Sequence, residues 1–89
     1  MSSINLVLDR LSAVLARRGT SRSQHYRTIT EGTFTPPVRV GVRCAAWPRH
    51  EIDALVAAEI AGATREQLRQ LVRQLMAQRS SFMPSLGVA

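Results

Sequence analysis

Glycine and proline residues divide this 89-residue chain into short segments, and their positions limit what it can fold into. Gly19 and Gly32 each follow a helical pattern, where glycine readily takes the left-handed conformation that ends a helix. Pro36 and Pro37 prevent a helix from continuing, and Gly62 separates two further helical patterns. These breaks predict one small domain of short helices, with room for a β-hairpin.

Two short helices are predicted ahead of residue 32. An extended lead-in around Leu8 is followed by helical spacing of apolar side chains over about residues 12–18, with Ser12 placed to cap the start. Ser21 is a good N-cap for a second helix that runs to about Glu31. The link between them has about the length of the turn in a helix-turn-helix, so we expect a steep crossing and an exposed face on the second helix.

The segment over residues 38–47 predicts a two-stranded β-hairpin that turns at Gly41. Arg39 and Arg43 lie on the two sides of its tip. A hairpin this small needs a neighbouring element to be stable. We expect Trp47 to anchor it on the helices.

A third helix is predicted from Pro48 to the break at Gly62, and a fourth begins after Thr64. Thr64 and Gln67 have the spacing of a capping box, in which side chains and backbone at the helix start bond reciprocally. The fourth helix carries an apolar stripe at helical spacing, formed by Leu68, Leu71, Val72, Leu75 and Met76. Its arginines fall mainly on the other face.

The purpose of this amphipathic helix has two possible answers at the level of sequence. The stripe closes the core of a marginal domain, or it forms, with Phe82 of the tail, a contact to a second copy or a partner protein. A two-fold dimer would suit an inverted DNA repeat, whereas a head-to-tail contact would continue along tandem repeats. We divide the chain into a domain over residues 1–62, this helix over 63–79, and a flexible or docking tail over 80–89.

The chain is strongly basic, with a net charge of +6, a pI of about 11.5, and arginine as every one of its 12 basic residues. Arginine is an always-charged planar fork that suits phosphate groups and guanine edges. A genomic bias toward arginine is an equally good explanation of the composition. The six acidic residues are scattered and form no pair at a spacing that suits acid–base chemistry.

Several functional classes are disfavoured. The sequence offers no nucleophile–base pair, metal-ligand cluster or glycine-rich phosphate loop, so we expect neither an enzyme nor a cofactor. The single Cys44 is expected to be a small apolar filler, and His25 and His50 lack ligand partners for a metal site. No apolar run approaches the roughly 20 residues of a membrane span, so we expect a cytoplasmic protein.

The predicted order of helix, tight turn, helix, arginine-tipped hairpin and helix is that of a winged helix-turn-helix. The expected fold is therefore mainly α with a small β-hairpin wing, extended by the C-terminal amphipathic helix. Polar side chains gather on the first two turns of the second helix, the part of a recognition helix that meets base edges. They are Ser21, Arg22, Ser23, Gln24, Tyr26 and Arg27.

Each of these side chains has an expected DNA contact. Arg22 and Arg27 can fork onto guanine and Gln24 onto adenine. Ser23 is expected to bond a phosphate, and Tyr26 either bonds a phosphate or packs under the wing. The wing arginines, Arg39 and Arg43, are expected in the neighbouring minor groove. A merely solvated helix face is the alternative.

The same segment resembles the AlpA family of small phage-type regulators, which are related to MerR-like winged-helix excisionases. The resemblance covers about residues 6–60 and rests on the order and spacing of several short elements. They are Val14-Leu15, Gly19-x-Ser21-Arg22-Ser23, Tyr26-Arg27, Glu31-Gly32-x-Phe34, Pro37-Val38-x-Val40-Gly41, Arg43, Trp47 and Glu51-Ile52-Asp53-Ala54. It implies a small, basic, non-catalytic protein that binds double-stranded DNA.

The resemblance further implies an excisionase, a recombination directionality factor of a prophage or integrative element in the bacterial cytoplasm. Such a protein binds repeated sites cooperatively, bends an attachment region and directs a site-specific integrase toward excision. The first alternative is an AlpA-type transcription regulator that acts at a promoter. A protein-interaction module without DNA binding is less favoured, as is a membrane-surface role for residues 64–79.

Overall fold

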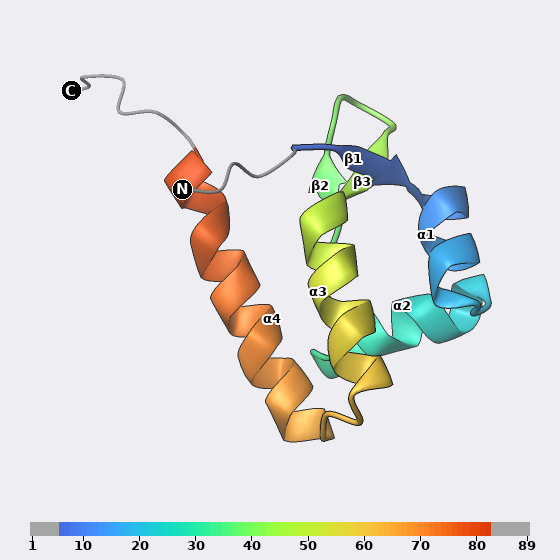
Figure 1. The fold of residues 1–89 in the computed structure, drawn as a ribbon. Helices are drawn as coiled ribbons and strands as arrows, with labels where there is room; N and C mark the ends of the chain where they lie inside the picture. The colour runs from blue at the N-terminus through green and yellow to red at the C-terminus, as the bar shows by residue number, and fades with distance from the viewer. Residues whose placement is uncertain (1–5, 83–89) are drawn as a thin grey trace.

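Three short strands form an antiparallel sheet beside four helices in the computed structural model, which describes residues 6–82 (Figure 1). The strand order is β1-β3-β2, with β1 at Leu8–Arg10, β2 at Val38–Arg39 and β3 at Ala45–Pro48. β2 and β3 pair as the predicted hairpin. The lead-in also joins the sheet, because β1 pairs with β3 from Leu8 to Arg10. This third strand is one of the neighbours that so small a hairpin needs.

The helix-turn-helix consists of α1 (Leu11–Arg18) and α2 (Arg22–Glu31), which cross steeply (Figure 1). α1 ends at Gly19, whose φ of 64° lies in the left-handed region. α2 begins as predicted, because the Ser21 side chain accepts a hydrogen bond from the backbone N–H of Gln24. The winged helix-turn-helix expected from the order of elements is confirmed.

The start of α1 corrects one expectation. β1 runs directly into α1, so the N-cap position falls on Arg10, the last strand residue, and the helix begins at Leu11. Arg10 makes no side-chain capping bond. Ser12 lies within the first turn and cannot be the cap predicted from the sequence.

The two remaining helices lie side by side (Figure 1). α3 spans Arg49–Ile60 with Pro48 at its N-cap position, and α4 spans Arg65–Arg79. The predicted capping box at the start of α4 is formed, with Thr64 and Gln67 each bonding the other's backbone N–H. A single 3₁₀ turn, η1 (Ser80–Phe82), follows α4. The rest of the predicted tail, residues 83–89, lies outside the described residues.

One hydrophobic core joins the helices to the sheet. Trp47 on β3 is fully buried, as predicted, and its indole N–H donates to the backbone carbonyl of Thr35 at 2.9 Å. The buried apolar residues of this core come from α1, the segment after α2, β3, α3 and α4. They are Val14, Phe34, Trp47, Ile52, Leu55, Val72 and Leu75.

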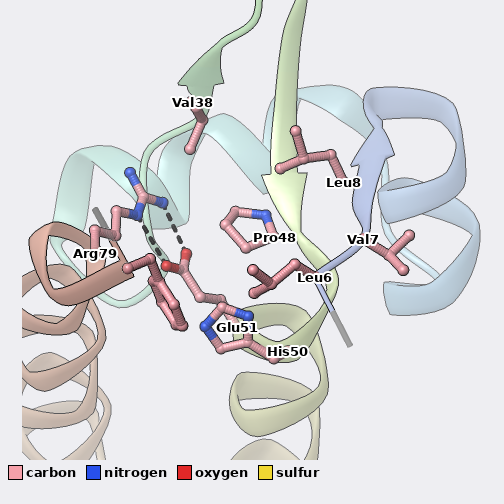
Figure 2. Close-up of a pocket in the computed structure, with 9 residues that line it drawn as sticks. Leu6, Val7, Leu8, Val38, Pro48, His50, Glu51 and Arg79 are labelled. Atoms are coloured by element: carbon pink, nitrogen blue, oxygen red, sulfur yellow. Dashed lines mark hydrogen bonds and ion pairs between the residues drawn. The ribbon is translucent and has the colours of Figure 1, made fainter. Parts of the chain in front are cut away.

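An ion pair between the buried Glu51 and the partly exposed Arg79 joins the end of α4 to the start of α3 (Figure 2). Glu51 is fully buried, and Arg79 donates to its two carboxylate oxygens at 2.7 and 2.8 Å. Arg79 also donates to the backbone carbonyl of Pro36 at 2.7 Å. The expectation that the arginines of the fourth helix lie on its outer face is therefore wrong for Arg79, because a buried carboxylate draws it inward.

Candidate nucleic-acid interface

Ion pairs divide the twelve arginines into two sets of six. The first set pairs with carboxylates and consists of Arg17, Arg18, Arg49, Arg69, Arg73 and Arg79. Their partners are Asp9, Glu51, Asp53, Glu59 and Glu66. At Asp9, hydrogen bonds from Arg49 lower the pKa of the carboxyl below its usual value. Arg17, Arg18, Arg49 and Arg79 join different elements of the fold through these pairs, whereas Arg69 and Arg73 pair with Glu66 within α4.

The second set makes no ion pair within residues 6–82, and all six of its members are exposed. They are Arg10, Arg22, Arg27, Arg39, Arg43 and Arg65. Five of them belong to the end of β1, to α2 and to the wing, while Arg65 lies at the start of α4. The uncompensated positive charge is therefore concentrated on the helix-turn-helix and the wing.

The faces of α2 have different surroundings. His25 is completely buried and faces the core, whereas Arg22, Ser23, Gln24, Tyr26 and Arg27 are exposed. Arg22 and Tyr26 lie one turn apart on one flank, and the Arg22 guanidinium carbon is 6.0 Å from the centre of the Tyr26 ring. Ser23 and Arg27 share the next face, farthest from the buried His25. Ser21 has its hydroxyl in the helix cap.

A polar hollow of about 460 Å³ lies between the start of α1, the flank of α2 and the wing. Among its lining residues are Arg10, Ser12, Arg22, Tyr26 and Arg43, so it collects three of the unpaired arginines. Two of these residues, Arg10 and Ser12, were not among the predicted site residues. No sequence signal marked Arg10, because strand alternation places it on the same face as Leu8, and only the structure shows that Asp9 is the buried residue of β1.

The wing presents both arginine and apolar side chains. Arg39 is paired with Ala45 in the sheet, and Val40 donates its backbone N–H to the carbonyl of Cys44 at 2.8 Å. Gly41 turns the chain with a φ of 109°, and Val42 beyond it is 91% exposed. The tip is therefore an exposed apolar residue close to the basic side chains on which the prediction rested.

The imidazole of His25 is part of the core rather than of the exposed face. Arg18 donates to its Nδ1 at 2.9 Å, and the rings of Tyr26, Phe34 and Trp47 surround it at centroid distances of 4.9–5.3 Å. Burial, followed by the charge of Arg18, lowers the pKa of His25 to about 4. The side chain is neutral at physiological pH. It packs α2 against β3 through its contact with Trp47.

The apolar stripe of α4 mostly packs on the chain's own core. Val72 and Leu75 are buried there, and Leu68 and Leu71 are half-buried against it. For Val72 and Leu75 this favours core closure over contact with a partner, because their side chains are covered within the monomer. The other two predicted contact residues, Met76 and Phe82, stay 37% and 38% exposed.

Phe82 lines a second, apolar hollow of about 360 Å³ (Figure 2). Its other walls include Leu6 and Leu8 beside β3, Pro48, and His50 at the start of α3. The His50 ring lies edge-on to Phe82 at a centroid distance of 5.4 Å. The hollow is on the side of the sheet where α4 ends, and its lining is different from that of the arginine-lined hollow.

Two further observations concern other types of site. Between residues 6 and 82, no group of three or more His, Cys, Asp or Glu side chains is placed to hold a metal ion. None of the helices in that range is long and apolar enough to cross a membrane.

Comparison with known proteins identifies the family. Residues 8–60 match the family described as prophage CP4-57 regulatory protein (AlpA). The chain belongs to the AlpA family. AlpA proteins are DNA-binding regulators of the phage type, and the matched segment runs from β1 to the end of α3. It contains the helix-turn-helix, the wing and five of the six unpaired arginines. The match confirms the family that the sequence resemblance indicated over about residues 6–60.

One relative is the uncharacterized protein ORF88 of enterobacteria phage P4. It is 39% identical to this chain over 56 residues, which are 63% of this chain and 64% of the relative. The chain thus spans less than two thirds of that relative's length. No solved structure matches the chain.

Proposed function

We propose that this AlpA-family chain binds double-stranded DNA with α2 in the major groove and the β2–β3 wing against the neighbouring minor groove. The first turns of α2 present Gln24 and Arg27 to base edges and Ser23 to a phosphate, as in other helix-turn-helix proteins. Arg39 and Arg43 of the wing reach the backbone or a narrow minor groove. The protein would act on the nucleoid in the bacterial cytoplasm.

The separation of paired and unpaired arginines carries this proposal. Random arginine enrichment would scatter unpaired guanidinium groups over the whole surface. Instead, five of the six carboxylates pair with arginines mainly around α3 and α4, and five unpaired arginines remain on β1, α2 and the wing, where Glu31 at the end of α2 is the one acid without an ion pair in residues 6–82. A concentration of positive charge on one part of the surface is typical of a protein that neutralises DNA phosphates.

Our finer proposal is a recombination directionality factor that binds an attachment region cooperatively, bends it and directs a site-specific integrase toward excision. Copies placed head to tail need two different contact patches on each molecule. Exposed apolar side chains in separate places support this: Leu6, Leu8 and Phe82 line the apolar hollow, while Val42 lies at the wing tip. Self-association and the integrase contact both belong to this proposal.

Footprinting on the DNA that flanks the gene, including any integrase gene and attachment site, tests the proposal. We expect protection of several evenly spaced direct repeats beside an attachment core, with bending seen by circular-permutation mobility shifts. The matched control is the double variant Arg27→Ala/Arg39→Ala, which should lose protection while keeping its circular-dichroism spectrum. No protection of any fragment by the wild-type protein would contradict DNA regulation altogether.

The alternative is an AlpA-type transcription regulator without a recombination role. The family description, a regulatory protein, favours it as the second candidate. Protection of a single inverted repeat at a promoter, without bending beside an attachment site, would establish this alternative and end the excisionase proposal.

A further inference from the structure

Three unpaired arginines converge on the polar hollow from three separate parts of the chain. Arg10 comes from the end of β1, Arg22 from the start of α2, and Arg43 from the wing. Tyr26 and Ser12 add hydroxyl groups to the same lining. The fold, and not the sequence order, therefore assembles a concave group of cations and hydroxyl donors at the junction of α1, α2 and the wing.

No carboxylate joins this group within the described residues. The nearest acid in the chain sequence, Asp9, is buried, and its oxygens are taken by Arg49 and Arg17. A guanidinium group does not lose its proton in a protein, so all three charges persist at any physiological pH. Like charges gathered around one hollow repel one another, and an anion between them would relieve that repulsion.

We propose that this hollow is a seat for a single DNA backbone phosphate, an inference that rests on the DNA binding proposed above. A phosphate oxygen accepts readily from guanidinium forks and from hydroxyl groups, and those are the donors that line the hollow. The Tyr26 ring lies beside the Arg22 guanidinium and helps to hold it in place. The seat fixes the angle between α2 and the wing on the duplex.

The seat changes the roles of two residues. Arg10, which nothing in the sequence assigned to DNA, becomes a phosphate contact. Arg22, expected from the sequence to read guanine, becomes a positioning residue that holds the backbone together with Arg43. Base reading by arginine on α2 then falls to Arg27, on the next face of the helix.

Salt dependence tests whether the three arginines share one phosphate. The dissociation constant for a mixed-sequence duplex would be measured by fluorescence anisotropy over a range of salt concentrations. The variants are Arg10→Ala, Arg22→Ala, Arg43→Ala and the triple variant, with Arg65→Ala as the matched control because Arg65 is also exposed and unpaired. Thermal unfolding by circular dichroism verifies that each variant keeps its fold.

We expect each single substitution in the seat to weaken binding about tenfold at fixed salt, since each removes charged hydrogen bonds. The triple variant should lose about 0.9 from the log–log salt slope, which corresponds to one phosphate, while three separate phosphates would remove about 2.7. A loss near the larger value would overturn the shared seat. The shared seat would also be overturned if Arg10→Ala bound DNA as tightly as the wild type and Arg65→Ala do. The proposed DNA binding would not be contradicted by that result. Failure of the wild-type protein to bind would instead contradict the proposed function.

Discussion

At the scale of single residues, His25 is the fully buried side chain of α2, a helix whose other polar side chains are mostly exposed. Arg18 can only donate hydrogen bonds, so its contact to Nδ1 requires that nitrogen to be the unprotonated acceptor. The proton of the neutral ring is then on Nε2, which is buried among aromatic rings and has no hydrogen-bond partner in the described structure. A second proton would place a buried positive charge beside Arg18.

Acid should therefore weaken the fold in a defined pH range. The pKa of His25 falls from its ordinary value of 6.5 to about 4 on folding, so the unfolded chain binds more protons between these values. Stability is full above pH 6.5 and declines toward pH 4, by about 2 kcal/mol between pH 7 and pH 4.5. Urea unfolding at the two pH values measures this loss.

The matched variant is His25→Leu, which removes the titrating group and fills the site with an apolar side chain. Its stability should change less between pH 7 and pH 4.5 than that of the wild type, because the side chain whose pKa falls to about 4 on folding has been removed. Equal pH dependence in the two proteins would show that protonation of His25 does not cause the loss of stability in acid.

Arg27 is the residue to which we assign base reading on the outermost face of α2. Arg27→Ala should relax the preference at one base position and cost about 1–3 kcal/mol of discrimination there. Binding-site selection from a random-sequence duplex library compares the preferences of variant and wild type. A uniform loss of affinity with unchanged base preferences would assign Arg27 to the backbone instead.

At the scale of elements, α4 docks on α3 through both apolar packing and the Glu51–Arg79 pair. The pair holds the C-terminal end of α4, a helix that lies outside the residues matched by the family. Removing one partner of a buried ion pair leaves an uncompensated charge, which costs more than the pair itself contributes. The docking of α4 is therefore sensitive to either side chain alone.

Arg79→Ala should lower the free energy of unfolding by about 3–5 kcal/mol, because Glu51 stays buried without its partner. Arg73→Ala is the matched control on the same helix, since its pair with Glu66 is exposed and should contribute below about 1 kcal/mol. Urea unfolding of both variants makes the comparison. Similar losses in the two would contradict a special role for the buried pair.

The elements predicted correctly were those specified by neighbouring residues. Ser21, Thr64 and Gln67 cap helices through bonds three residues away, and Gly19 ends α1 in its own backbone conformation. The missed features depend on residues far apart in the chain. Arg79 meets Glu51 across 28 positions, and no local pattern separates such an arginine from an exposed one.

The candidate site was predictable in part for the same reason. The exposed face of α2 followed from its cap and turn, and the residues expected there are exposed in the structure. That Arg10 lines the same hollow as Arg22 and Arg43 depends on the pairing of β1 with β3, which the sequence did not reveal. The roles assigned to individual side chains in DNA contact stay predictions.

At the scale of the whole molecule, the arginines that form ion pairs and those that do not lie mainly in different parts of the fold. Arginines that meet carboxylates hold β1, α1, α3 and α4 together, and the excess lies on the helix-turn-helix and wing. Five of the six unpaired arginines belong to β1, α2 and the wing, so most of the excess positive charge is concentrated in that part of the molecule. DNA binding through this face is the central claim.

The salt dependence of wild-type affinity for DNA tests that claim most directly. Fluorescence anisotropy with a labelled duplex, repeated at increasing salt, gives the slope of log affinity against log salt concentration. Neutralisation of phosphates by the unpaired arginines predicts a slope of about −2 or steeper for each bound copy, because Arg10, Arg22 and Arg43 share one phosphate and Arg39 adds a second, at about 0.9 each. A slope near zero, with no measurable preference for DNA at low salt, would contradict it.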